Sequence, residues 1–190
     1  RVIFEGRDVT SRDAVARARA GLGRTFQISA LAMEDTVLQN AVLGAAGRAG
    51  AAFSLFTPVM KNRILLDAAE EALEAVGLTE FRALRTDELS HGQRRQLEVA
   101  VALTLRPKAF LMDEPMAGLG MEGTQAMTAF LDGLRHRAPI LLVEHDMDAV
   151  FRLADRISVL VYGEIVATGT PDEIRADPAV RAAYLGEATP

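Results

Sequence analysis

The chain has no cysteine, and none of its apolar segments is long enough to form a membrane-spanning helix. Without cysteine, a disulfide framework and a thiolate zinc site are both excluded, which is typical of a cytosolic protein. A membrane helix needs about 20 consecutive apolar residues. The uncharged stretch 49–60 is shorter, and glycine, serine, threonine and proline interrupt it. An integral membrane span is therefore not expected.

Clustered positive charge is also missing: 21 lysines and arginines stand against 26 aspartates and glutamates, the net charge is −5, and no stretch concentrates Lys and Arg on an aromatic-bearing face. Because binding to nucleic acid requires clustered cations, nucleic acid is not an expected partner. The chain starts with Arg1-Val2-Ile3-Phe4 and has no initial methionine. We therefore expect Arg1 to be an interior position of a longer protein, and no signal peptide is visible.

The hydrophobic pattern changes along the chain. In the segment 36–86 apolar residues recur at helical spacing, and Gly77 ends the clearest helix, which predicts a mostly helical block. From Lys108 onward, apolar strands alternate with helices, which predicts an α/β fold with a parallel sheet. The predicted strands are 23–28, 109–112, 140–143, 157–161 and 165–167, the last two as a hairpin. The predicted helices are 12–20 with Ser11 as its cap, 92–105, 122–136, 147–154 and two short ones from Pro171 and Pro178.

Two adjacent carboxylates, Asp113 and Glu114, follow the apolar strand. The carboxyl edge of a parallel sheet is where α/β folds bind ligands. Asp113 is a candidate for holding Mg²⁺, in part through water, and Glu114 for polarising an attacking water. The alternative is a strand that ends in charged residues as it leaves the core. His145 follows the next strand, where it is a candidate contact for a γ-phosphate or a structural residue.

A second polar motif, Leu89-Ser90-His91-Gly92-Gln93, lies at the start of a predicted helix. Helix N-termini favour anions, Gly92 lets a phosphate approach the backbone, and Ser90 offers a hydroxyl. A simple helix cap would need Ser90 alone, and the following Arg94-Arg95-Gln96 makes this segment more specific than a cap. Gln27 follows Arg24-Thr25-Phe26 on the early extended segment. Its amide is a candidate for a catalytic role, because it can ligate Mg²⁺ through its oxygen and sense the attacking water.

In this order, these segments resemble the nucleotide-binding subunit of an ATP-binding cassette (ABC) transporter along essentially the whole chain. The resemblance implies a P-loop NTPase, RecA-like α/β core with a parallel sheet, whose N-terminal part lies outside the printed residues. It assigns 1–27 and 92–190 to this core and 28–91 to an inserted, all-helical signature subdomain.

The resemblance also implies roles for the polar residues. Gln27 corresponds to the Q-loop glutamine, 89–93 to the signature motif, 110–113 to the Walker B strand, Glu114 to the catalytic carboxylate, Ala117-Gly118-Leu119 to the D-loop and His145 to the switch histidine. ATP and Mg²⁺ are the implied cofactors, with Asp113 and Gln27 at the metal. Leu89, Ser90, His91, Gly92 and Gln93 would contact the ATP of a partner subunit.

A narrower similarity, to the ATPases of branched-chain amino acid importers, is carried by 23–27, 90–95, 144–147 and 183–187. It implies an ATPase that energises import as a peripheral, cytoplasmic subunit on the inner face of the cell membrane. The implied partners are a second ATP-binding subunit, identical or different, transmembrane permease subunits and, indirectly, a periplasmic or extracellular solute-binding protein. The alternatives are an ABC ATPase for lipopolysaccharide export or for urea or amide import, and a truncated, non-catalytic fragment that offers only its signature motif.

Three departures from the family pattern stand out. His91 occupies a position where many members have glycine. Gly120 occupies the D-loop position of an aspartate or asparagine, so it makes no side-chain contact across a dimer. The printed residues include neither a Walker A loop with its lysine nor the upstream aromatic that stacks on adenine. We therefore expect these 190 residues alone not to hydrolyse ATP.

The stretch 49–60 supports one more hypothesis. It is uncharged and includes Phe53 and Phe56, so it is a candidate docking segment for the membrane permease. The alternative is a loop that packs on itself with buried phenylalanines.

Overall fold

The structure, a computed structural model, describes residues 1–24, 31–49 and 59–184 of the chain. The chain divides into two compact units, Arg1–Glu144 and His145–Pro190. These units differ from the two predicted subdomains, which are a core formed by 1–27 together with 92–190 and a helical subdomain formed by 28–91. That division stays a prediction.

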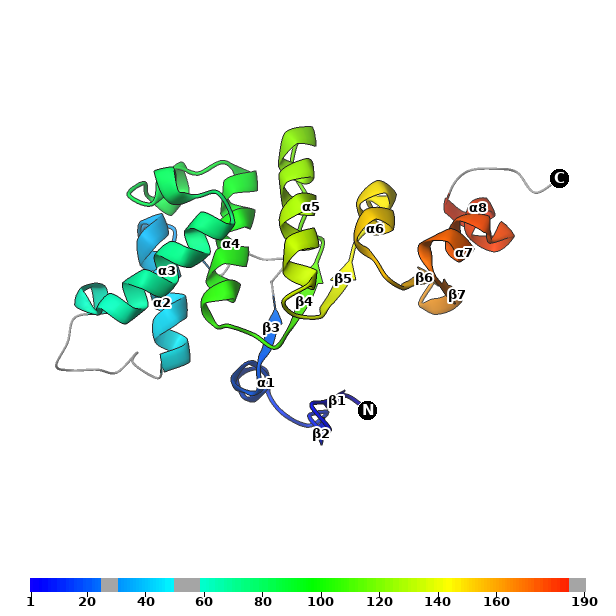
Figure 1. The fold of residues 1–190 in the computed structure, drawn as a ribbon, viewed down its shortest axis with the longest axis horizontal. Coiled ribbons are helices and arrows are strands. Elements are labelled where there is room, and N and C mark those ends of the chain that lie inside the picture. The colour runs from blue at the N-terminus through cyan, green and yellow to red at the C-terminus, as the bar shows by residue number, and fades with distance from the viewer. Residues whose placement is uncertain (25–30, 50–58, 185–190) are drawn as a thin grey trace. The chain divides into compact units, whose positions relative to one another are not determined.

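A parallel sheet of three strands lies in the first unit, in the order β3-β4-β5 (Figure 1). Leu22 of β3 pairs with Ala109 of β4, and Phe110 of β4 pairs with Ile140 of β5. Phe110 and Met112 are buried. The predicted parallel α/β sheet is thus confirmed, although the predicted strand 23–28 lies partly outside the described residues. The strands span Leu22–Arg24 (β3), Ala109–Asp113 (β4) and Ile140–Val143 (β5).

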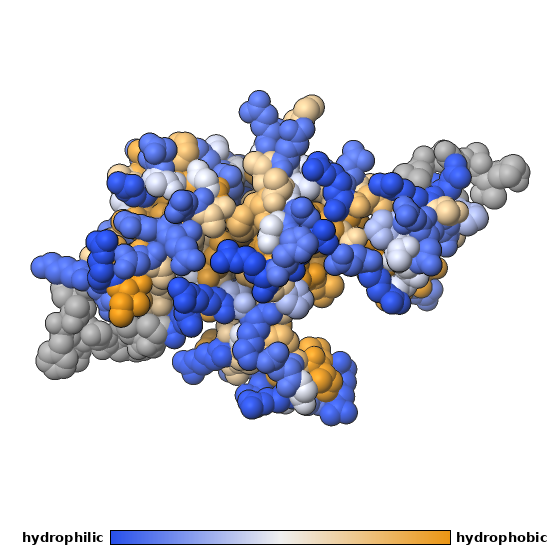
Figure 2. Space-filling model, viewed as in Figure 1, coloured by the Kyte–Doolittle hydropathy of each residue, from blue (hydrophilic) through white to orange (hydrophobic). Residues whose placement is uncertain are grey.

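Three helices of the same unit contact one another and form the predicted helical block (Figure 1). Their shared core includes Val42, Leu73 and Leu97, one from each helix, all buried. Figure 2 shows hydrophilic side chains interspersed with apolar ones over the outer surface of these helices. The helices are α2 (Val37–Ala49), α3 (Arg63–Ala75) and α4 (His91–Thr104), joined by the short 3₁₀ turns η2 (Val59–Lys61), η3 (Thr79–Phe81) and η4 (Thr86–Glu88).

The N-terminal part of this unit corrects one prediction. Ser11 does not cap the first helix, because the Asp13 side chain accepts a hydrogen bond from the Ala16 amide at 2.7 Å and the helix begins after it. The remaining elements of the unit are β1 (Ile3–Phe4), which pairs antiparallel with β2 (Arg7–Asp8), α1 (Ala14–Ala20) and α5 (Met121–Arg135).

The second unit is built around an antiparallel pair of strands, as predicted. The connecting residues Tyr162 and Gly163 both have positive φ, which matches a tight hairpin turn. A small core forms from Ile157, Val159, Ile174 and Val180. The elements are α6 (Met147–Leu153), β6 (Ile157–Val161), β7 (Glu164–Gly169), α7 (Pro171–Ala176) and α8 (Pro178–Tyr184). Within the described part of the chain, every helix is too short or too polar to cross a lipid bilayer.

Candidate functional site

The carboxylate pair lies where β4 ends, as the sequence predicts. Asp113 is the last residue of the strand, and the Glu114 amide donates a hydrogen bond to the Val143 carbonyl of β5 at 2.8 Å. Glu114 has a φ of 46°, a left-handed conformation that costs a non-glycine residue about 1–2 kcal/mol. The chain then turns, and the Ala117 amide donates to the Glu114 carbonyl at 3.1 Å. Asp113 and Glu114 thus stand at the carboxyl edge of the sheet.

Glu144 anchors the turn that follows Glu114. Its side-chain oxygen Oε1 accepts a hydrogen bond from the Met116 amide at 2.9 Å. Glu144 comes directly after β5, so this contact ties the loop after β4 to the end of the neighbouring strand. Glu144 has no role among the residues predicted from the sequence. Its position was the one signal in the sequence, because a carboxylate directly after the predicted strand 140–143 is expected at the same sheet edge as Asp113 and Glu114.

The signature segment forms the capped helix start that was predicted for it. Ser90 is the N-cap of α4, and its hydroxyl accepts from the Gln93 amide at 3.3 Å. The Gln93 side chain in turn accepts from the Ser90 amide at 2.9 Å, which completes a capping box. Leu89 is buried, whereas Ser90 and His91 are exposed. Ser90 therefore presents its hydroxyl at the positive end of a helix.

The start of α4 lies against the loop 117–119. A Cβ atom on Gly118 would lie 2.8 Å from His91 Nε2, and one on Gly92 would lie 2.9 Å from Leu119 Cδ2. Gly118 also has a φ of 73°, which L side chains rarely adopt. The residues predicted as signature motif and D-loop are therefore in contact within this chain.

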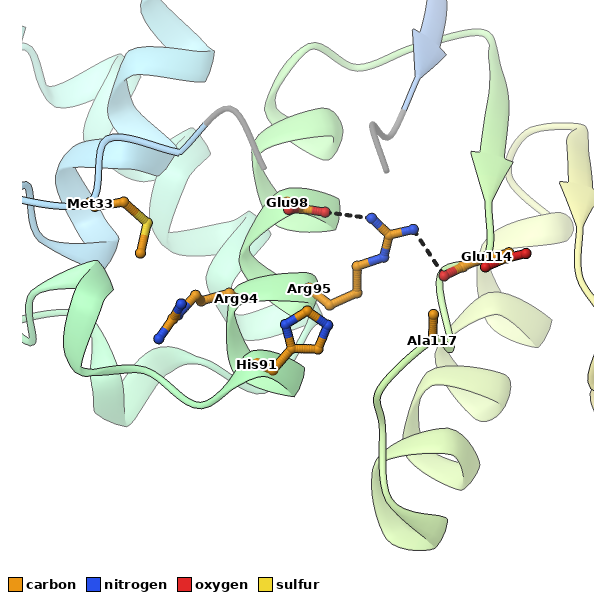
Figure 3. Close-up of a pocket in the computed structure, with 7 residues that line it drawn as sticks. All are labelled: Met33, His91, Arg94, Arg95, Glu98, Glu114 and Ala117. Carbon is orange, nitrogen blue, oxygen red and sulfur yellow. Dashed lines mark hydrogen bonds and ion pairs between the residues drawn. The ribbon is translucent and has the colours of Figure 1, made fainter. Parts of the chain in front are cut away.

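Arg95 connects α4 with the carboxylate pair (Figure 3). Its Nη1 atom lies 2.6 Å from Glu98 Oε2, and its Nη2 atom donates to the carbonyls of Asp113 and Glu114, the latter at 2.9 Å. Arg95 is only 6% exposed. From the sequence, Arg95 was predicted only as part of the motif, although an arginine and a glutamate three residues apart among apolar helix positions were a signal for a buried ion pair.

A small pocket lies between α4 and the turn after β4 (Figure 3). Its volume is about 140 Å³, below the roughly 300 Å³ at which ligand pockets begin. This space alone does not accommodate a nucleotide. Its lining consists of Met33, His91, Arg94, Arg95, Glu98, Glu114 and Ala117.

The other predicted site residues either fall outside the described part of the chain or belong to the second unit. Gln27 lies outside the described residues, as do Phe53 and Phe56 of the proposed docking segment. His145 opens the second unit and is exposed, directly before Asp146, whose side chain caps α6. Among residues 1–24, 31–49 and 59–184, no three acidic or histidine side chains are grouped as a metal site would require. Of the two predicted Mg²⁺ ligands, only Asp113 is described.

Two family models match this chain. The model described as "ABC transporter" matches residues 1–117. A second model, described as "Branched-chain amino acid ATP-binding cassette transporter", matches residues 164–189.

Proteins of similar sequence can be aligned with most of this chain. The high-affinity branched-chain amino acid transport ATP-binding protein BraF of Pseudomonas aeruginosa is 37% identical over 97% of this chain and 75% of its own length. LivG of Escherichia coli, with the same description, is 38% identical over 90% of this chain and 70% of its own length. A probable LivG from Methanocaldococcus jannaschii is 31% identical.

Solved structures of ATP-binding cassettes share this fold. A nucleotide-free cassette from an ABC transporter superimposes with a TM-score of 0.81 at 28% identity, over 98% of this chain and 77% of that one. A cassette in its ADP conformation gives a TM-score of 0.80, also at 28% identity and with the same coverage.

Proposed function

This chain belongs to the ABC transporter family as an ATP-binding subunit, and we propose that it hydrolyses ATP to energise the import of branched-chain amino acids. The solute is proposed because the relatives BraF and LivG are named for that transport. The match of residues 164–189 to the branched-chain amino acid family supports the same solute.

In this proposal, the carboxylates at the end of β4 act on the ATP that this chain binds. Asp113, together with Gln27, would hold Mg²⁺, an ion that takes one or two protein carboxylates and completes its shell with phosphate oxygens and water. The donor set at the end of β4 fits that preference. The bound ion would neutralise charge on the phosphates. Glu114 polarises the attacking water, and His145 contacts the γ-phosphate.

The signature residues serve a different nucleotide in this proposal. The Ser90 hydroxyl and the first amides of α4 face a phosphate of the partner subunit's ATP, with Gly92 allowing close approach. This helix start is formed by the residues of the signature motif, which include Leu89, His91 and Gln93. The loop of Ala117, Gly118 and Leu119 packs against it. The helical segment 28–91 then acts as the signature subdomain of a core formed by 1–27 and 92–190.

The partners follow from the same proposal. Two ATP-binding subunits, identical or different, would associate on the cytoplasmic face of the membrane with transmembrane permease subunits. A periplasmic or extracellular solute-binding protein would deliver the amino acid to the permease. We also propose that the 190 printed residues by themselves do not hydrolyse ATP, because neither Lys61 nor Lys108 follows a glycine.

The observation that carries the enzymatic proposal is the position of Glu114 at the carboxyl edge of the sheet. We expect Glu114→Gln to lower ATP turnover by about 10²–10⁴-fold, the usual contribution of a general base, while ATP binding persists. The measurement is ATPase activity and nucleotide affinity of the natural protein assembled with its permease in proteoliposomes.

The control for this variant is Glu122→Gln, an exposed glutamate in the first turn of α5, which should keep wild-type turnover. Turnover that survives Glu114→Gln would contradict the proposed role. In the same vesicles, ATP-driven uptake of labelled leucine but not urea is the expected result. Uptake of urea alone would contradict the proposed solute.

A further inference from the structure

The link between α4 and the end of β4 has a consequence for catalysis. We propose that Arg95 is a positioning residue that sets the backbone conformation of Glu114 and thereby couples the signature helix to the carboxylate acting on ATP. This inference rests on the proposed function of Glu114.

The hydrogen bonds of Arg95 flank the Glu114 α-carbon. Its Nη2 atom donates to the carbonyl that precedes Glu114, that of Asp113, and to the carbonyl of Glu114 itself. These carbonyls belong to the two peptide planes on either side of the α-carbon. When both planes are held, φ and ψ of Glu114 are set, and so is the direction of its Cα–Cβ bond, from which the side chain extends.

Glu114 needs such support because its conformation is unfavourable. At a φ of 46°, a residue other than glycine persists only where its surroundings hold it in place. Two further backbone hydrogen bonds contribute, from the Glu114 amide to Val143 and from the Ala117 amide to Glu114. Arg95 contributes the charged donor, and such hydrogen bonds are about twice as strong as neutral ones.

Arg95 is itself held in one orientation. Its other terminal nitrogen, Nη1, pairs with Glu98 at 2.6 Å, and both side chains are largely buried, at 7% and 12% exposure. The planar guanidinium can therefore direct one nitrogen to a carboxylate on α4 and the other to the carbonyls after β4 (Figure 3). A lysine, which carries a single point charge, lacks this divided geometry.

The position of Arg95 on α4 adds a second consequence. Ser90, the N-cap of the same helix five residues before Arg95, is proposed to contact the partner's ATP, whereas Glu114 is proposed to act on this chain's own ATP. A displacement of α4 that follows nucleotide binding at Ser90 is transmitted through Arg95 to Glu114. The two nucleotide sites of a dimer are coupled through this side chain.

The test replaces the ion pair with apolar side chains of similar size, in the double variant Arg95→Met with Glu98→Leu. Such replacements of buried ion pairs are often neutral for stability. In the natural protein assembled with its permease, we expect kcat for ATP hydrolysis to fall at least tenfold while the Kd for ATP stays within twofold. Hydrogen exchange of the Ala117 amide, measured without nucleotide, should become at least tenfold faster.

The matched control is Asp132→Leu with Arg135→Met, an ion pair of the same spacing on the surface of α5. It should change neither kcat nor exchange at Ala117. A wild-type kcat or unchanged exchange in the Arg95 double variant would overturn the inference. A wild-type protein without ATPase activity would refute the proposed function instead, and the exchange measurement would still decide whether Arg95 holds this backbone.

Discussion

Glu114 and Gly118 both adopt left-handed backbone conformations in the loop after β4, with φ values of 46° and 73°, but for different reasons. Glu114 is a non-glycine residue whose flanking carbonyls are hydrogen-bonded by Arg95. Gly118 is a glycine whose Cβ side is filled by the His91 ring. His91, the departure from the family's signature glycine, is thus accommodated by the absence of a side chain at Gly118.

This packing predicts the effect of a methyl group at Gly118. We expect Gly118→Ala to lower the free energy of unfolding by about 1–3 kcal/mol, because alanine is strained at this φ and its Cβ would overlap the His91 ring. Urea denaturation of the natural protein measures the change.

Two further variants test the cause. Gly133→Ala, in open space on α5, should raise the free energy of unfolding by about 0.5–1 kcal/mol, since glycine is unfavourable inside a helix. Adding His91→Gly to Gly118→Ala should recover the part of the loss that is due to overlap. If His91→Gly recovers nothing, the contact between His91 and Gly118 does not contribute.

Three helices, α4, α5 and α6, differ in how their first turns are capped. Ser90 caps α4 and Asp146 caps α6 through side-chain hydrogen bonds, whereas Gly120 at the start of α5 makes none. The next residue, Met121, is 81% exposed. The start of α5 is therefore the least supported of these three, directly after the loop 117–119 that contacts the signature segment.

Proline at the first position of α5 should correct this. Gly120 already has φ −72° and ψ 175°, the extended conformation that a residue before proline prefers. We expect Met121→Pro to raise the free energy of unfolding by about 0.4–1 kcal/mol, mainly by restricting the unfolded chain. Thermal or urea denaturation provides the measurement.

The position of the proline decides its effect. Met127→Pro, at a buried interior position of the same helix, should instead cost about 3 kcal/mol or more. A stabilising Met127→Pro, or a strongly destabilising Met121→Pro, would show that α5 does not begin at Met121.

The predicted site residues fall in both compact units of the chain. The first unit contains the carboxylates, the signature segment and the loop 117–119, and the second begins with His145. The donors that cradle β- and γ-phosphates in P-loop proteins come from a glycine-rich loop with a lysine. Neither lysine of the printed residues follows a glycine.

This composition predicts the behaviour of the 190 residues when they are produced alone. We expect no measurable ATPase activity and no tight ATP binding, determined by phosphate release and calorimetry. The same residues preceded by a glycine-rich Gly-Lys-Ser or Gly-Lys-Thr segment of a relative should bind ATP. Normal turnover by the 190 residues alone would refute the prediction.

A structural feature can be predicted from this sequence when it depends on residues that are neighbours in the chain. The apolar run before Asp113, the helical spacing before Gly77 and the serine cap at Ser90 each depend on neighbouring residues, and all three predictions are confirmed. The first helix shows the limit of this reasoning. Ser11 and Asp13 are both good caps by residue type, and only the hydrogen bond to Ala16 distinguishes them.

The parallel sheet, the helical block and the carboxylates at a strand end could all be predicted from residue order, because hydrophobic periodicity and helix caps depend on residues close together in the chain. The folded structure was needed to show that His91 lies on Gly118, that Glu144 accepts from the Met116 amide and that Arg95 donates to the carbonyls around Glu114. These contacts join residues 18 to 28 positions apart, and their geometry depends on how the elements pack rather than on local preference.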